Sequence, residues 1–164
     1  MKKFFAMAAM FCLGLSASAQ SDSKMAAGAN LNVGVGDSYT NVGIGAKFQY
    51  RFIERMRGEA SFNFFFPKYH SSYWDVNLNA HYLFPIGETG LTAYPLAGFS
   101  IIGSTYSYLG YSSSASSFAL NYGGGIEYQI TEKFKVNAEV KGHTGFATGW
   151  GTRGVFSLGA AFCF

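Results

Sequence analysis

The chain has 164 residues, a length that fits one domain, and it carries 12 Lys and Arg against 9 Asp and Glu. This near balance of charge excludes the strongly basic surface that nucleic-acid binding requires, so we expect no nucleic-acid partner. Gly (21), Phe (17) and Tyr (11) are abundant while Pro (3) is scarce, which favours an all-β protein with aromatic-rich surfaces.

The first 19 residues have the pattern of a cleavable signal peptide. Two lysines precede an apolar stretch over residues 4–15, which is too short to span a bilayer as a finished helix. The small residues Ala-Ser-Ala follow at positions 17–19 and predict cleavage before Gln20, with a retained membrane anchor as the weaker alternative. We therefore expect a mature domain over residues 20–164.

The rest of the chain alternates apolar and polar residues with a period of two, which predicts strands rather than helices. We expect eight strands, at residues 25–36, 41–52, 56–66, 73–84, 91–103, 118–130, 134–143 and 153–164.

The connections between these strands alternate in length. Those at 53–55, 85–90 and 131–133 are short, whereas those at 67–72, 103–117 and 144–152 are longer or rich in Ser, Gly and Tyr; the short connection at 37–40 is an exception. Short turns on one side and longer loops on the other are typical of transmembrane barrels.

The two faces of the predicted strands differ in charge. Over the six strands with the clearest alternation, one face has no charged residue, and the other contains nine: Lys47, Arg51, Arg57, Glu59, Asp75, Glu127, Lys135, Glu139 and Lys141. A soluble barrel would turn the apolar face inwards. The interior of eight strands is only just wide enough for side chains, however, and would be overfilled by Phe, Tyr and Leu. We therefore expect the apolar face outside and the polar face inside.

Large aromatic residues gather near the strand ends on the apolar face. Amphipathic rings at such positions suit the boundary between membrane and water. The sequence therefore predicts an aromatic girdle made of Tyr50, Phe52, Phe66, Trp74, Tyr82, Phe84, Phe118, Tyr128, Phe162 and Phe164.

The chain resembles a known family on these features, together with the strand-to-turn element at residues 50–55 and the last strand, which ends in Phe164. It is similar to the small outer-membrane barrels of the OmpX and OmpA-transmembrane-domain type, and in particular to the "porin family" barrels of Bacteroidetes. The resemblance implies an all-β fold, an eight-stranded antiparallel up-and-down transmembrane β-barrel, integral in the cell outer membrane of a Gram-negative bacterium. It also implies that the barrel-assembly machinery recognises the C-terminal strand ending in Phe164.

The nine inward charges are five basic and four acidic. We expect Glu59 near Arg51 and Glu127 near Lys135 on adjacent strands, directly across or one diagonal step away. We interpret the set as a plug that neutralises itself and leaves little room for water. A narrow porin for small solutes or ions is the alternative.

The remaining polar residues suggest two further functions. His70, His81 and His143 raise the possibility of a lipid-modifying enzyme, but their spacing fixes no nucleophile beside a base. We therefore predict no enzyme and no catalytic, metal-binding or cofactor-binding residues. Three tyrosines of the longest loop, among Ser and Gly, form either a surface for partners or an extension of the strands and girdle: Tyr106, Tyr108 and Tyr111.

Overall fold

The computed structural model describes residues 24–36, 40–68, 71–108 and 111–164. Its strands are β1 (Met25–Val35), β2 (Thr40–Ile53), β3 (Met56–Lys68), β4 (Ser71–Tyr82), β5 (Phe84–Ile86), β6 (Leu91–Tyr108), β7 (Tyr111–Thr131), β8 (Phe134–Gly145) and β9 (Thr152–Cys163). Within the described ranges, no helix is long and apolar enough to cross a membrane.

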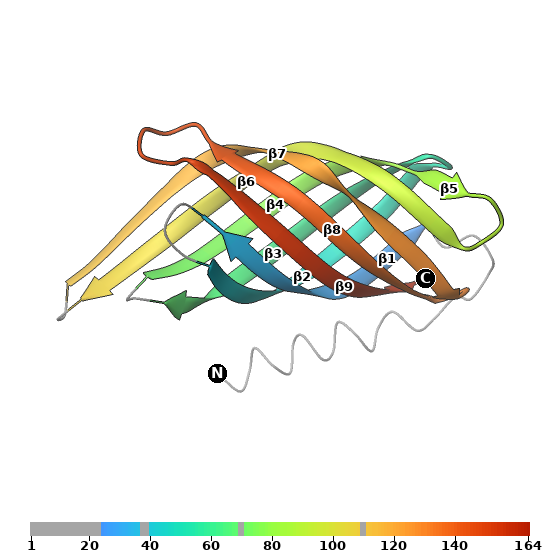
Figure 1. Cartoon of the computed structure of the whole chain (residues 1–164), viewed down its shortest axis with the longest axis horizontal. Helices are drawn as coiled ribbons and strands as arrows, with labels where there is room; N and C mark the ends of the chain where they lie inside the picture. Colours follow the sequence, from blue (N-terminus) through green and yellow to red (C-terminus); the bar gives the residue numbers. More distant parts are fainter. Residues whose placement is uncertain (1–23, 37–39, 69–70, 109–110) are drawn as a thin grey trace.

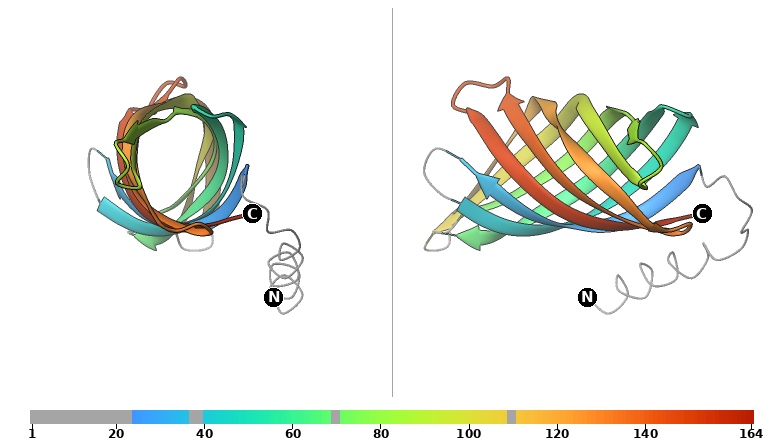
Figure 2. Two further views of the ribbon diagram at one scale, coloured as in Figure 1. Left: turned by 90° about the vertical axis from the view of Figure 1, so that its right-hand side faces the viewer. Right: turned by 45° about the vertical axis from the view of Figure 1, so that its right-hand side comes forward.

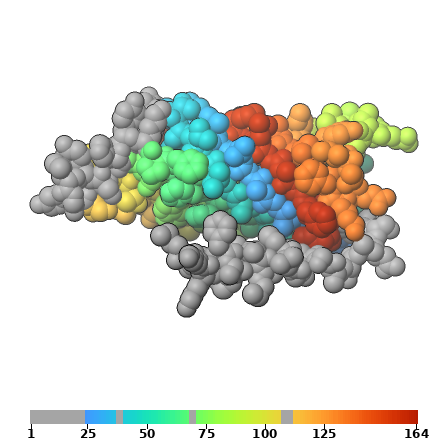
Figure 3. Space-filling view, turned by 90° about the horizontal axis from the view of Figure 1, so that it is seen from below, coloured from blue at the N-terminus to red at the C-terminus, as the bar shows by residue number. Residues whose placement is uncertain are grey.

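The strands close into one antiparallel barrel (Figures 1 and 2). Apart from β4 and β5, strands that are neighbours in sequence pair with each other. Strand β1 pairs with β9 to complete the ring, as the contact between blue and red segments in Figure 3 shows. Both β4 and β5 pair with β6, and only Leu83 separates them, so together they form the single strand predicted over 73–84. The predicted eight-stranded antiparallel barrel is thus confirmed.

The two faces of the sheet have opposite character, as the alternation predicted. Outward side chains such as Leu78, Phe99 and Val140 are 67%, 62% and 60% exposed. Charged and amide side chains on the other face are buried in the lumen. The barrel is therefore apolar outside and polar inside, the reverse of a soluble β-protein.

The two ends of the barrel differ in length and chemistry. At one end, the backbones of Met25 and Phe164 exchange hydrogen bonds, and tight turns follow β2, β5 and β7. Gly87 and Gly90 take positive φ angles of 58° and 74° in the second of these turns, a conformation that other residues rarely adopt. We call this the termini end. We call the opposite end, where the β6–β7 pair projects furthest (Figure 1), the hairpin end.

The prediction of a long loop over residues 103–117 is wrong. Strand β6 continues to Tyr108 and β7 begins at Tyr111, and the pairing runs unbroken from Gly103↔Ser116 to Tyr108↔Tyr111. The alternation disappears there because the outward face of these strand segments no longer has apolar surroundings and their inward face no longer borders the lumen. The backbone hydrogen bonds between β6 and β7 continue although the side-chain alternation has ended. The predicted loop at 67–72 is shortened for the same reason, whereas a loop does follow β8, over residues 146–151.

Candidate functional site

The lumen holds a group of ionised side chains in its half nearest the termini. We call it the charged layer: Lys47, Arg57, Glu59, Glu127, Lys135, Glu139 and Lys141, all at most 7% exposed. They come from β2, β3, β7 and β8. Because alternate side chains of a strand lie on the same face, each of these residues points into the lumen. Closure of the sheet into a barrel then brings residues from opposite walls close together.

Glu127 is paired twice within this layer. It accepts a hydrogen bond from Arg57 Nη1 across the barrel at 2.7 Å and lies 3.3 Å from Lys135 Nζ on the adjacent strand. The expected neighbourhood of Glu127 and Lys135 is therefore present. The bond to Arg57, 70 residues away in sequence, became visible only in the closed fold.

The other two glutamates have different partners. Glu139 Oε1 lies 3.2 Å from Lys141 Nζ. Arg51 lies one diagonal step from Glu59 in the register, as expected, but Glu59 accepts its hydrogen bond from Gln49 Nε2, at 2.7 Å. Gln49 is the residue directly opposite Glu59 in the register, whereas Arg51 is opposite Arg57. Arg51 itself is only half-buried.

Tyr94 is the largest fully buried side chain of the lumen, and the sequence analysis did not identify it. Its ring stacks on His81, with centroids 4.8 Å apart and an interplanar angle of 11°. Its hydroxyl donates to Glu139 Oε2 at 3.2 Å. A Cβ added at Gly125 would lie 2.6 Å from Tyr94 Cζ, so this glycine makes the space for the ring. The Gly123–Gly125 run was the available signal for a large inward partner.

Glu59, His81 and Glu139 bring possible metal ligands within 4.8 Å of one another. Arg57 Nη2, however, lies 3.0 Å from His81 Nδ1 and can only donate, so Nδ1 is the acceptor and the ring proton is on Nε2. A metal-binding histidine needs one nitrogen free and normally donates from the other. Lys47 and Lys141 add two further cations nearby. The arrangement therefore favours internal charge pairing over a metal ion.

A second layer of hydrogen-bonded amides and hydroxyls lies towards the hairpin end. In this amide belt, Asp75 Oδ1 accepts from Asn63 and Asn77 at 2.6 and 2.5 Å. Asn121 donates to Asn77 and Asn79 at 3.2 and 2.9 Å. Asp75, expected in the charge network, thus accepts its hydrogen bonds from amides of this belt. The belt is completed by Asn32, Ser61, Ser100 and Ser157.

Arg153 lies at the hairpin end of the lumen and was also missed in the sequence. Its guanidinium lies over the rings of Phe65 and Tyr73, at 4.2 and 4.8 Å from their centroids, and donates to Asn41. Its side chain passes over Gly34, where an added Cβ would collide with it. Three successive sets of side chains therefore line the lumen between its two ends.

The predicted aromatic girdle residues lie on the outward face near the two ends. Tyr50, Phe52, Tyr82, Phe84, Tyr128, Phe162 and Phe164 are near the termini end, and Phe66, Trp74 and Phe118 are nearer the hairpin end. Of the three predicted loop tyrosines, Tyr106 is 49% exposed and belongs to β6, while Tyr108 and Tyr111 face each other in the register. The side chains of Tyr108 and Tyr111, and the whole of His70, fall outside the described residues.

Comparisons with known proteins agree with this geometry. A family model described as outer membrane protein β-barrel domain matches residues 5–164. None of the curated proteins matches the chain.

Solved structures share the fold at low identity. The N-terminal β-barrel domain of Pseudomonas aeruginosa OprF superposes with a TM-score of 0.70 at 19% identity, covering 88% of this chain and 100% of that one. Neisserial surface protein A gives 0.68 at 19%, with 85% and 96% covered. The attachment invasion locus protein Ail of Yersinia pestis gives 0.62 at 21%, also with 85% and 96% covered.

Proposed function

The chain belongs to the family of outer membrane protein β-barrel domains, and on this premise we propose that it works at the cell surface through its hairpin end, with a closed lumen. An even number of strands returns both termini to the same side, which in such barrels is the periplasm. The hairpin end then faces outwards from the cell. The role is that of a surface-interaction protein on a rigid scaffold.

The free edge of β7 carries this proposal. The pairing of β7 with β8 begins only at Ala119↔Gly145, whereas its pairing with β6 extends to Tyr111. In the described structure, residues 113–116 therefore have β6 on one side and no strand on the other. An unpaired edge presents a row of backbone donors and acceptors that an extended segment of a partner can join.

The chemistry of the edge indicates the kind of partner. Residues 113–116 read Ser-Ser-Ala-Ser, are exposed, and carry neither charge nor bulk. The neighbouring β6 is paired with β4 as far as Ser71↔Tyr106, so the hairpin is supported on its other side. A neutral extended peptide fits this edge better than a polyanion, because backbone hydrogen bonds and not ion pairs would supply the affinity.

A charge placed on the edge tests the proposal. Lysine on an edge strand discourages strand addition, so Ser114→Lys should lower the adhesion of cells that produce the protein to plates coated with fibronectin, laminin or collagen. Thr40→Lys, at the exposed start of β2 at the same end but on the opposite wall of the barrel, adds the same charge away from the edge and should not. Adhesion no greater than that of cells lacking the protein, or equal adhesion of wild type and Ser114→Lys, would contradict the proposal.

A non-enzymatic role is part of the proposal. His81 and His143 are 1% and 2% exposed inside the barrel, where a membrane lipid has no access. The alternative of a narrow porin is disfavoured by the three sets of side chains that line the lumen. If the protein did modify lipids, lipid A from cells producing it would change in mass, and His143→Ala would remove that change.

Export and assembly complete the proposal. We infer that the protein is exported by its signal peptide and cleaved before Gln20, so protein isolated from outer membranes should begin at that residue. The backbone of Phe164 exchanges hydrogen bonds with Met25 at 2.9 and 3.3 Å, where the first and last strands meet. Recognition of this last strand by the barrel-assembly machinery predicts that removing Phe164 lowers the amount of protein in the outer membrane.

A further inference from the structure

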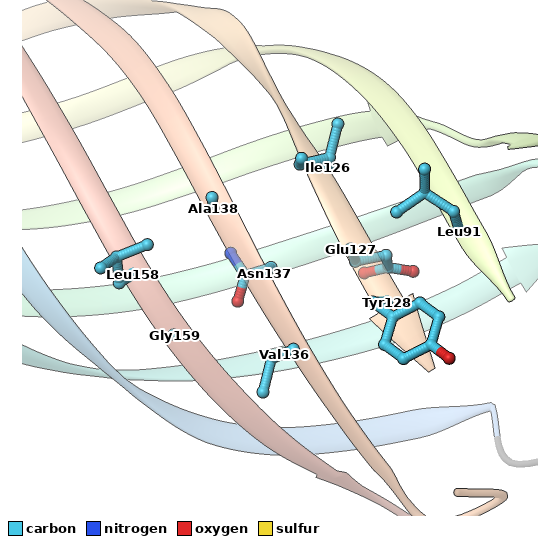
Figure 4. A pocket seen from close by; sticks show the side chains of 9 residues that line it. All are labelled: Leu91, Ile126, Glu127, Tyr128, Val136, Asn137, Ala138, Leu158 and Gly159. Carbon is cyan, nitrogen blue, oxygen red and sulfur yellow. The ribbon is translucent and has the colours of Figure 1, made fainter. Parts of the chain in front are cut away.

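A groove runs over the outward face of β7, β8 and β9 (Figure 4). Its volume is about 350 Å³, and its outward side chains are all apolar or aromatic. They come from four neighbouring strands: Leu91, Ile126, Tyr128, Val136, Ala138 and Leu158. The groove is therefore a feature of the surface of the barrel and separate from the lumen.

The groove arises from the sizes of side chains that lie opposite one another in the register. Ala138 is between Ile126 on β7 and Leu158 on β9. The two larger side chains are each 50% exposed, whereas Ala138 is half-buried between them. Val136, also half-buried, continues the floor towards the termini end beside Tyr128. Large residues form the walls, and small residues form the floor.

The surroundings of the groove identify what it meets. It is continuous with the outward apolar face, which in an outer-membrane barrel contacts lipid. Its floor begins near the turn between β7 and β8. Lys133 in that turn is three residues before Val136, about 10 Å away along an extended chain. Lys133 is exposed, and the ion pairs of the described residues do not include it.

We propose that this groove holds one acyl chain of a glycerophospholipid whose phosphate lies beside Lys133. A flat apolar face contacts a chain from one side, while a groove contacts it from three, and the summed dispersion attraction grows with the number of contacts. The cation at the open end of the groove complements the phosphate. Glu132, the other charge of this turn, would limit that attraction, so the acyl contact supplies the larger share. The orientation proposed above puts this lipid in the periplasmic leaflet.

Filling the groove tests the proposal. The full chain would be released into the gas phase from nanodiscs of phosphatidylethanolamine and phosphatidylglycerol, and the retained lipids counted by native mass spectrometry. We expect one retained lipid on the wild type. Ala138→Phe should lower that occupancy several-fold, since its ring occupies the floor of the groove and removes the chain's packing contacts there. Leu158→Ala, which removes a wall instead, should lower it as well.

Ala60 provides a matched control. It too lies between large outward residues, Phe48 and Leu78, but it is exposed instead of half-buried. Ala60→Phe adds the same ring to the lipid-facing surface and should keep the retained lipid. Heat-dependent gel migration would show that each variant is folded. A wild type that carries no lipid, or Ala138→Phe and Ala60→Phe variants that retain it equally, would overturn the proposal.

The role of Lys133 is tested separately. Lys133→Gln should weaken retention of phosphatidylglycerol several-fold while Lys24→Gln, another exposed cation at the termini end, leaves it unchanged. Equal retention by both variants would refute the phosphate contact. These outcomes do not depend on adhesion. Failure of the surface-interaction proposal would therefore not refute the lipid-binding groove, and failure of the groove proposal would not refute the surface interaction.

Discussion

Strand β7 crosses two surroundings, and its two halves differ accordingly. Within the barrel its side chains alternate: Leu120 is 39% exposed and its neighbour Asn121 fully buried. Beyond Ser117 towards the hairpin end, residues 112–116 are all exposed, yet the backbone pairing with β6 continues unchanged. The outer half is held mainly by backbone bonds and exposed hydroxyl contacts, whereas the inner half is also held by the lumen on one face and by apolar surroundings on the other. Stability should therefore depend on the barrel half and hardly on the hairpin half.

The largest expected effect comes from removing a cation of the charged layer. Arg57→Ala leaves Glu127 buried with Lys135 as its remaining ion-pair partner, and breaking a buried pair in this way costs about 3–5 kcal/mol of unfolding free energy. Reversible urea unfolding in lipid vesicles, followed by tryptophan fluorescence, measures this cost. Arg55→Ala, in the exposed turn before β3, is the control and should change stability by less than about 0.5 kcal/mol. Equal effects of the two variants would show that the layer does not stabilise the barrel.

The charged layer shows which contacts in the lumen a sequence pattern can predict and which it cannot. The alternation placed Arg57, Glu127 and Lys135 inside, because inward and outward positions meet opposite surroundings. It could not show that Arg57 reaches Glu127 across the barrel, because that contact depends on how the sheet closes. The diagonal step in the register brought Lys135 to Glu127, whereas the same step between Arg51 and Glu59 leaves Glu59 bonded to Gln49.

The features that the sequence analysis missed have a physical reason too. Strand β6 begins Leu-Thr-Ala-Tyr-Pro-Leu, with apolar residues on both faces, so Tyr94 did not stand out as an inward residue. Its place depends on Gly125 of the neighbouring strand. The outer halves of β6 and β7 were predicted as a loop because neither lumen nor lipid imposes a pattern there. The missed tyrosine and the wrongly predicted loop have the same cause, because both depend on tertiary surroundings that the sequence of a single strand does not show.

A charge on the outward face of the barrel half should have the next largest effect. Leu78 is 67% exposed on that face, so Leu78→Arg places a guanidinium in hydrocarbon, at about 2–4 kcal/mol near the middle of the membrane. Ser114→Arg in the hairpin half keeps its new charge in water and should cost little. Urea midpoints in vesicles compare the two variants. If Leu78→Arg proved as stable as Ser114→Arg, the outward face would not be the lipid-facing one.

A glycine of the lumen should have a smaller effect. A Cβ at Gly125 would approach Tyr94 Cζ to 2.6 Å, so Gly125→Ala forces the ring to move and should cost about 1–3 kcal/mol through overpacking. A smaller residue at position 94, as in Tyr94→Leu, should reduce the additional cost of Gly125→Ala, which a double-mutant cycle measures. Strict additivity of the two substitutions would show that the glycine and the tyrosine are not coupled.

The smallest effect is expected in the hairpin half. The Thr105 and Ser114 hydroxyls lie 3.2 Å apart in an exposed pair, and exposed pairs of this kind contribute little. Ser114→Ala should change the unfolding free energy by less than about 0.5 kcal/mol. If Ser114→Ala lowered the unfolding free energy as much as Gly125→Ala, the two halves of β7 would contribute equally to stability, which would contradict the comparison.

Planar bilayer recording on the refolded protein is the most direct test of the closed lumen that we propose. Eight buried charges that pair or hydrogen-bond within the barrel, together with the amide belt and Arg153, predict a membrane that stays closed after insertion of the protein, without resolved single-channel steps. Heat-dependent migration of the same sample would show that the barrel is folded. Stable, large single-channel steps that scale with the amount of inserted protein would contradict the account.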